Sequence, residues 1–185
     1  PFFNYDKFNF VNGDVTNTKS LLEQTKSHDV IIHLAALVGY SICEKNPSFT
    51  DLINSQSTKT IVESLSKDQL IMYGSTGSNY GKVDGICTEE TPLNPNSVYA
   101  KTKTAGELFT MEHSNAISYR FATAFGASLR LRLDLLVNDL TYLATSQGYI
   151  LVYQPEFMRT FIHVRDMAKS FLFGIENQDK MSGEV

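Results

Sequence analysis

The chain has 185 residues, the size of one domain, so a long multidomain assembly is excluded. Gly and Pro are too few for a low-complexity chain, and 42% apolar residues are enough to build a core. The formal net charge of −4 offers no basic surface to a polyanion, so nucleic acid is not expected as a partner.

The two cysteines, Cys43 and Cys87, have no CxxC spacing and no neighbouring pair of histidines, so neither a disulfide scaffold nor a metal site is predicted. Free thiols fit a reducing compartment, and the expected location is the cytoplasm. The longest apolar stretch, 30–43, is interrupted by polar residues and is shorter than the ~20 residues of a membrane span. No secretory signal is visible, and the chain begins with Pro1 instead of Met, so we expect a fragment.

Strands and helices are predicted to alternate along the first half of the chain. Residues 29–36 form a β-branched run that is typical of a buried parallel strand, and 47–66 carry apolar residues at helical spacing. A second strand over 69–73 leads into a small polar loop over 74–79. After an irregular segment at 81–95, Asn96 or Ser97 is expected to cap a helix that continues to Met111.

The second half follows the same alternation. It is predicted to contain a strand over 116–124, a helix over 134–146, short strands at 149–153 and 160–164, and a helix over 165–176. This order indicates an α/β fold with a doubly wound parallel sheet and helices on both faces.

Two sequence features could carry chemistry. Tyr99 and Lys103 are four positions apart on a predicted helix, so they share one face. An ammonium near a phenol favours the phenolate, so we expect Lys103 to lower the pKa of Tyr99 and make it a general base. Ser75 and Thr76 follow a predicted strand and could hold a substrate oxygen. A surface Tyr–Lys pair and ordinary turn chemistry would also explain these residues.

Seven short motifs occur in a familiar order along the chain. They are Gly13-Asp14-Val15, His33-Leu34-Ala35-Ala36, Asn54, Ser75-Thr76 with Asn79-Tyr80-Gly81, Tyr99-x-x-x-Lys103, Tyr119-Arg120 through Phe125-Gly126, and Arg159 through Asp166. Together they resemble the extended short-chain dehydrogenase/reductase superfamily, in its NAD-dependent epimerase/dehydratase branch. Phe125 stands where the family usually has Tyr.

The resemblance implies an incomplete Rossmann-like doubly wound parallel sheet over residues 1–126. Residues 127–185 would be part of a small C-terminal substrate lobe, interleaved with the last elements of the sheet. The resemblance also implies NAD as the cofactor, with NADP not excluded, and a nucleotide-sugar as the substrate. It suggests a homodimer formed through the Tyr99 helix and the preceding helix. No metal and no membrane are expected as partners.

The resemblance also assigns residues to roles. The catalytic residues would be Thr76, Tyr99 and Lys103. The cofactor would contact Asp14, Val15, Leu34, Ala35, Ala36, Asn54, Ser75, Tyr99 and Lys103. The substrate would contact Thr123, Asn138 and Arg159. Arg159 would bind the diphosphate, because a guanidinium can donate two hydrogen bonds to it. His33 and His163 are expected to be structural.

Two departures from the family pattern limit this interpretation. The glycine-rich turn that receives the cofactor pyrophosphate is absent, so we expect the chain as given to hold NAD poorly. Thr76 is followed by Gly77-Ser78, where nucleotide-sugar 4,6-dehydratases carry an Asp-Glu pair. The favoured reaction is therefore C4 epimerisation by transient hydride transfer to tightly bound NAD. The alternatives are a GDP- or dTDP-sugar reductase/epimerase, a dehydratase of the same family, and a non-catalytic dinucleotide sensor.

Overall fold

A three-stranded parallel sheet forms the centre of the molecule in a computed structural model, which describes residues 5–185. The strands β1 (Val30–His33), β2 (Leu70–Thr76) and β3 (Ala116–Phe121) lie in the order β1-β2-β3. Both neighbouring pairs are parallel. The central strand β2 is apolar over its first four residues, and all four are buried.

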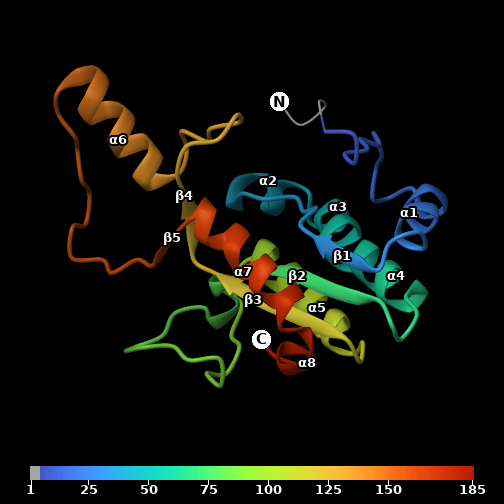
Figure 1. The fold of residues 1–185 in the computed structure, drawn as a ribbon. Helices are drawn as coiled ribbons and strands as arrows, with labels where there is room; N and C mark the ends of the chain where they lie inside the picture. Colours follow the sequence, from blue (N-terminus) through green and yellow to red (C-terminus); the bar gives the residue numbers. More distant parts are fainter. Residues whose placement is uncertain (1–4) are drawn as a thin grey trace.

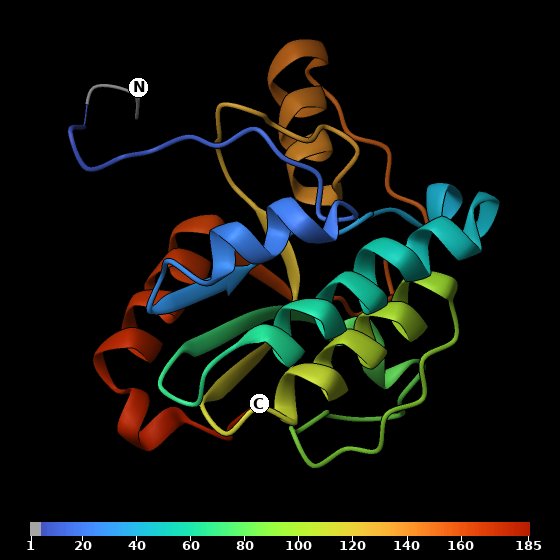
Figure 2. The same ribbon diagram turned by 90° about the vertical axis from the view of Figure 1, so that its right-hand side faces the viewer.

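Helices cover both faces of this sheet (Figures 1 and 2). Leu70 and Met72 of β2 pack on one face against Phe171 of α7 (Val164–Glu176). Ile71, which points to the other face, packs against Ile61 of α4 (Ser57–Ser64). Burial on both sides explains why the strand shows no polar alternation. The predicted doubly wound α/β fold is confirmed.

The predicted helix 47–66 is confirmed as a continuous run that ends at residue 64. It starts with α3 (Pro47–Asp51), passes through a π-helical turn, η2 (Leu52–Gln56), and continues as α4. The sequence analysis did not predict the short helices α1 (Thr18–Thr25), α2 (Tyr40–Lys45) and α8 (Gln178–Met181).

Helix α5 (Val98–Met111) lies against β2 and β3 and starts as predicted. The Ser97 hydroxyl caps it by accepting a hydrogen bond from the Ala100 amide at 3.1 Å. Gly106 allows a close approach, because a Cβ there would collide with the Tyr73 hydroxyl and the Asn54 carbonyl. The middle of α5 therefore packs closely against β2 and the π-helical turn η2.

Several predicted strand boundaries differ from the structure. The strand predicted at 29–36 ends at His33, and β2 runs three residues further than predicted before a 3-10 turn, η3 (Gly77–Tyr80). The strand predicted at 116–124 divides, because β4 (Thr123–Phe125) leaves the main sheet to pair with β5 (Phe161–His163).

The segment between β4 and β5 stands away from the sheet (Figure 1). The predicted helix 134–146 is confirmed as α6 (Leu136–Gln147), which has no buried residue. The strand predicted at 149–153 is wrong, since these residues are exposed and pair with no strand among the described residues. An apolar run forms a strand only when a neighbour accepts and donates its backbone hydrogen bonds.

Candidate functional site

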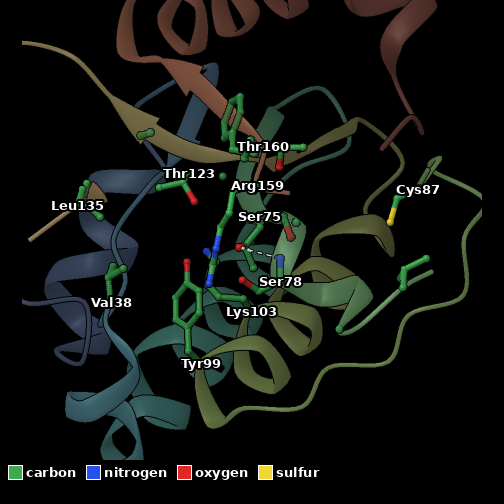
Figure 3. Close-up of a pocket in the computed structure, with 18 of the residues that line it drawn as sticks. Val38, Ser75, Ser78, Cys87, Tyr99, Lys103, Thr123, Leu135, Arg159 and Thr160 are labelled. Carbon is green, nitrogen blue, oxygen red and sulfur yellow. Dashed lines mark hydrogen bonds between the residues drawn. The ribbon is translucent and has the colours of Figure 1, made fainter. Parts of the chain in front are cut away.

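A cleft of about 1010 Å³ opens beyond the carboxyl ends of β1 and β2 (Figure 3). Strand ends at this edge of a doubly wound sheet are where such folds bind ligands. The cleft is bounded by the first turns of α5, by β4 and by the segments around 81–87 and 156–160. The main sheet and the outlying strand β4 therefore both contribute to it.

The three predicted catalytic residues are brought together in this cleft. Tyr99 and Lys103 lie one turn apart on α5, and Thr76 is the last residue of β2. Figure 3 shows the Tyr99 side chain reaching into the hollow between Val38 and Lys103. The Thr76 hydroxyl accepts a hydrogen bond from the Ser78 amide at 3.2 Å, which holds the turn after β2.

The predicted lowering of the Tyr99 pKa by Lys103 is wrong for this structure. Burial raises the pKa of Tyr99, although a hydrogen bond with Thr76 and the charge of Arg132 act in the opposite direction. Burial also lowers the pKa of Lys103 to about 7, because only 1% of that residue is exposed. The physical reason is that burial disfavours the charged phenolate, and this desolvation outweighs the stabilisation that the nearby hydrogen bond and positive charge provide.

Lys103 lies beneath the site against an aromatic ring. Its Nζ is 3.8 Å from the centre of the Tyr73 ring, a cation–π distance. His33 lies on the neighbouring strand, where its Nε2 is 3.0 Å from the Thr58 hydroxyl. Burial and the charge of Lys103 lower the pKa of His33 to about 3, so this histidine is neutral. Its buried, hydrogen-bonded setting agrees with the structural role expected for it.

The predicted cofactor residues fall into two groups. Leu34, Ala36 and Ser75 line the cleft, whereas Ala35 does not. Asp14 and Val15 also lie outside it: Asp14 accepts two hydrogen bonds from Thr16, each 2.8 Å long, in the exposed turn before α1.

Asn54 holds the chain after β1 and does not line the cleft. Its side chain is fully buried in the π-helical turn. Its Oδ1 accepts from the Leu37 amide at 2.7 Å, and its Nδ2 donates to the Leu37 carbonyl at 3.0 Å and to the Thr102 hydroxyl at 3.2 Å. Asn54 thus ties the loop beside the cleft to α5.

The predicted substrate residues also divide. Thr123 and Arg159 line the cleft (Figure 3). Asn138 is not among the lining residues. The Asn138 side chain accepts from the Gly126 amide at 3.1 Å and donates to the Arg132 carbonyl at 3.0 Å. It therefore fixes the turn that carries Arg132.

The sequence analysis missed two cations of the cleft, Lys82 and Arg132. With Arg159 and Lys103 they give the cleft lining four basic side chains, against one carboxylate, Glu156. Such a surplus of positive charge suits an anionic ligand. Neither residue had a sequence signal, since an arginine or lysine in a loop is usually a solvated surface group.

Other kinds of site are not found in the part of the chain that the structure describes. Residues 5–185 contain no cluster of His, Cys, Asp and Glu that could hold a metal ion. No helix among them is both long and apolar enough to cross a bilayer.

The fold and the cleft define a doubly wound α/β protein with a ligand site at the carboxyl ends of its strands. The chain belongs to the NAD dependent epimerase/dehydratase family, whose sequence pattern matches residues 2–185. The resemblance inferred from the motifs is thereby confirmed.

Curated relatives carry two kinds of enzyme name. The chain is 33% identical over 118 residues to a UDP-glucose 4-epimerase of Mycolicibacterium smegmatis, and this match covers 60% of this chain and 37% of that protein. It is 28% identical over 114 residues to a dTDP-glucose 4,6-dehydratase of Streptomyces niveus, and this match covers 60% of this chain and 34% of that protein. The matches therefore span about a third of each relative's length.

A solved structure has the same fold. The UDP-glucuronic acid 4-epimerase of Bacillus cereus, in complex with UDP-glucuronic acid and NAD, superposes with a TM-score of 0.85. The match covers 100% of this chain and 60% of that chain, at 24% sequence identity. At this identity the likeness establishes the fold alone.

Proposed function

We propose that this chain carries the catalytic part of an NAD-dependent nucleotide-sugar 4-epimerase. The observation that carries the proposal is that Thr76, Tyr99 and Lys103 line one cleft at the carboxyl ends of the strands. Family membership and the epimerase among the curated relatives support the same reaction class.

The walls of the cleft fit the nicotinamide half of NAD. Gly74 keeps the ends of β1 and β2 in close contact, since a Cβ there would lie 2.8 Å from Leu34 Cδ2. Leu34 and Ala36 offer an apolar wall to an aromatic ring, and Lys103 offers a donor to ribose hydroxyls. When bound, NAD supplies a hydride acceptor that can return the hydride.

The chain's own residues supply the proton chemistry. In its phenolate form, Tyr99 accepts the proton of the sugar C4 hydroxyl and later returns it, while the Thr76 hydroxyl orients the same oxygen. Because burial raises the pKa of Tyr99, the phenolate depends on positive charge nearby, which Arg132 supplies from within the chain. Arg159 and Lys82, which both line the cleft, bind the diphosphate of the substrate.

A second candidate is dehydration of the sugar, which the similarity to the Streptomyces niveus dehydratase favours. Elimination of water from a keto-sugar needs a further acid and base. Gly77 and Ser78, which follow Thr76, carry no carboxyl group. We therefore place epimerisation first.

The test is turnover by the intact protein of UDP-, dTDP- and GDP-sugars without added cofactor, with products identified by NMR. We expect the 4-epimer, and a loss of about 10²–10⁴-fold in kcat for Tyr99→Phe. Tyr40→Phe, at an exposed tyrosine of α2, is the matched control and should have normal kcat.

Three other outcomes would contradict the proposal. Unchanged turnover in Tyr99→Phe would remove Tyr99 as the base. A 4-keto-6-deoxy product would establish the dehydratase. Release of NAD on denaturation without turnover of any nucleotide-sugar would establish a dinucleotide sensor.

We also propose a homodimer and a reducing, cytoplasmic location. On α5, Leu108 is 57% exposed, which suits a helix–helix interface with a second copy. Cys43 and Cys87 are both free thiols, as a reducing compartment would keep them.

A further inference from the structure

Five polar side chains form a cluster behind the catalytic cleft, named here the Glu107 cluster: Ser75, Asn79, Glu107, Ser118 and Arg120. Glu107 is its centre and is only 1% exposed. The Arg120 guanidinium donates two hydrogen bonds to Glu107 Oε1, from Nη2 at 2.7 Å and from Nε at 3.0 Å. Asn79 Nδ2 donates to Oε2 at 3.1 Å, and the Ser118 hydroxyl donates to it at 3.4 Å.

The cluster joins the two elements that carry the proposed catalytic residues. The Asn79 amide group donates to Ser75 Oγ at 2.9 Å as well as to Glu107. Ser75 immediately precedes Thr76 at the end of β2, and Glu107 lies one turn after Lys103 on α5. A single amide therefore couples the end of the strand to the helix.

Glu107 is also placed to act on the charge of Lys103. The Lys103 ammonium lies over the Tyr73 ring of β2 and interacts electrostatically with His33 of β1 and with Glu107. Tyr99 and Glu107 lie one turn before and one turn after Lys103 on its own helix. Within residues 5–185, no carboxylate lies within 4.0 Å of Lys103 Nζ. His33 is neutral and adds no charge. Glu107 is the carboxylate among these groups, and its negative charge raises the pKa of Lys103 against the effect of burial.

We propose that Glu107 is a positioning residue of the site, which increases the charged fraction of Lys103 and, through Asn79, fixes the end of β2 against α5. This inference rests on the role of Lys103 in the proposed function. Arg120 sets the strength of the effect, because its guanidinium neutralises part of the Glu107 charge that Lys103 feels. The ion pair is thus a regulator of the Lys103 charge as well as a structural contact.

The experiment is a pH titration of Lys103 in the intact protein, followed by NMR of ¹³C-labelled lysine and assigned with Lys103→Met. We expect Glu107→Gln to lower the Lys103 midpoint by about one pH unit, because the neighbouring negative charge is lost. We expect Arg120→Gln to raise it, because Glu107 is no longer neutralised. Glu112→Gln, at the exposed C-cap of α5, is the control and should leave the midpoint unchanged.

A purely structural role would give a different pattern. Loosening of the core admits water and moves the Lys103 midpoint upward in both variants, toward its ordinary value. An unchanged or raised midpoint in Glu107→Gln therefore overturns the proposal. Should Glu107→Gln fail to fold, the double variant Glu107→Gln/Arg120→Gln removes both charges, keeps hydrogen-bonding groups, and is expected to lower the midpoint.

The coupling through Asn79 has its own test. Asn79→Val retains both charges, so the Lys103 midpoint should stay within experimental error. The amide of Thr76 should exchange hydrogen about tenfold faster, as one lost hydrogen bond implies. Unchanged exchange overturns the coupling. None of these measurements needs turnover, so the failure of one proposal can be told from the failure of the other. A protein that converts no nucleotide-sugar rejects the proposed function. If its Lys103 midpoint still moves down in Glu107→Gln and up in Arg120→Gln, this inference stands.

Discussion

The sheet region and the segment 127–160 are built on different principles. In the sheet region, Tyr73, Lys103 and Glu107 are enclosed between parallel strands and α5, and their positions follow from close packing. In the segment 127–160, Tyr153 is 80% exposed and Met158 is 96% exposed. The proposed proton chemistry thus belongs to the packed region, whereas Arg159, which is proposed to bind the substrate diphosphate, belongs to the exposed one.

The ion pairs of the two regions make the difference concrete. Glu107–Arg120 and Arg132–Asp134 have similar N–O distances, 2.7 and 2.5 Å. The first pair is buried and the second is solvated. Because desolvation makes an unpaired buried charge costly, equal distances do not mean equal contributions to stability.

The largest expected effect on stability is the loss of the buried pair. Glu107→Gln leaves the Arg120 guanidinium without its carboxylate, and we expect the free energy of unfolding to fall by about 3–5 kcal/mol. Urea unfolding followed by circular dichroism measures it. A loss below about 1 kcal/mol would place this pair in the same class as the exposed one.

Two methionines test the packing of the two regions. Met72 is fully buried in β2, and we expect Met72→Ala to cost about 2–5 kcal/mol because it opens a cavity between the sheet and α7. Met158→Ala is the control from the exposed segment and should change stability by less than about 0.5 kcal/mol. Equal losses measured by urea unfolding would contradict the contrast.

The pH dependence of stability tests the burial of Lys103. Its pKa is about 7 in the folded protein and 10.5 in the reference state, so between these values the unfolded chain binds the extra proton. Stability contributed by this group therefore rises with pH across the window, by about 1.4 kcal/mol per pH unit at most. The slope should be smaller in Lys103→Met. Identical slopes from urea unfolding at several pH values would show that the ammonium is not desolvated.

The smallest expected effect belongs to the exposed pair. Asp134→Asn removes the partner of Arg132, and we expect a change in unfolding free energy of about 0–1 kcal/mol, because solvent already screens both charges. Differential scanning calorimetry at low and high salt measures it. A loss as large as that of Glu107→Gln would remove the distinction between the two regions.

Local patterns in the sequence predicted much of the packed region. Apolar runs located β2 and β3, helical spacing located α5, and Ser97 was one of the two caps considered. These features depend on neighbours within a few residues, so they can be inferred without the fold. The same approach failed at 149–153, where an apolar run has no partner strand in the described structure.

The sequence by itself determined the alternation of strands and helices, the four-residue spacing of Tyr99 and Lys103, and the family to which the chain belongs. Only the tertiary structure decided that burial raises the pKa of Tyr99, that Asn54 and Asn138 hold loops beside the cleft, and that Asn79, Glu107 and Arg120 meet. The physical reason is that spacing fixes only which residues share a strand or a helix face. Desolvation and long-range hydrogen bonds depend on the groups that distant segments bring alongside.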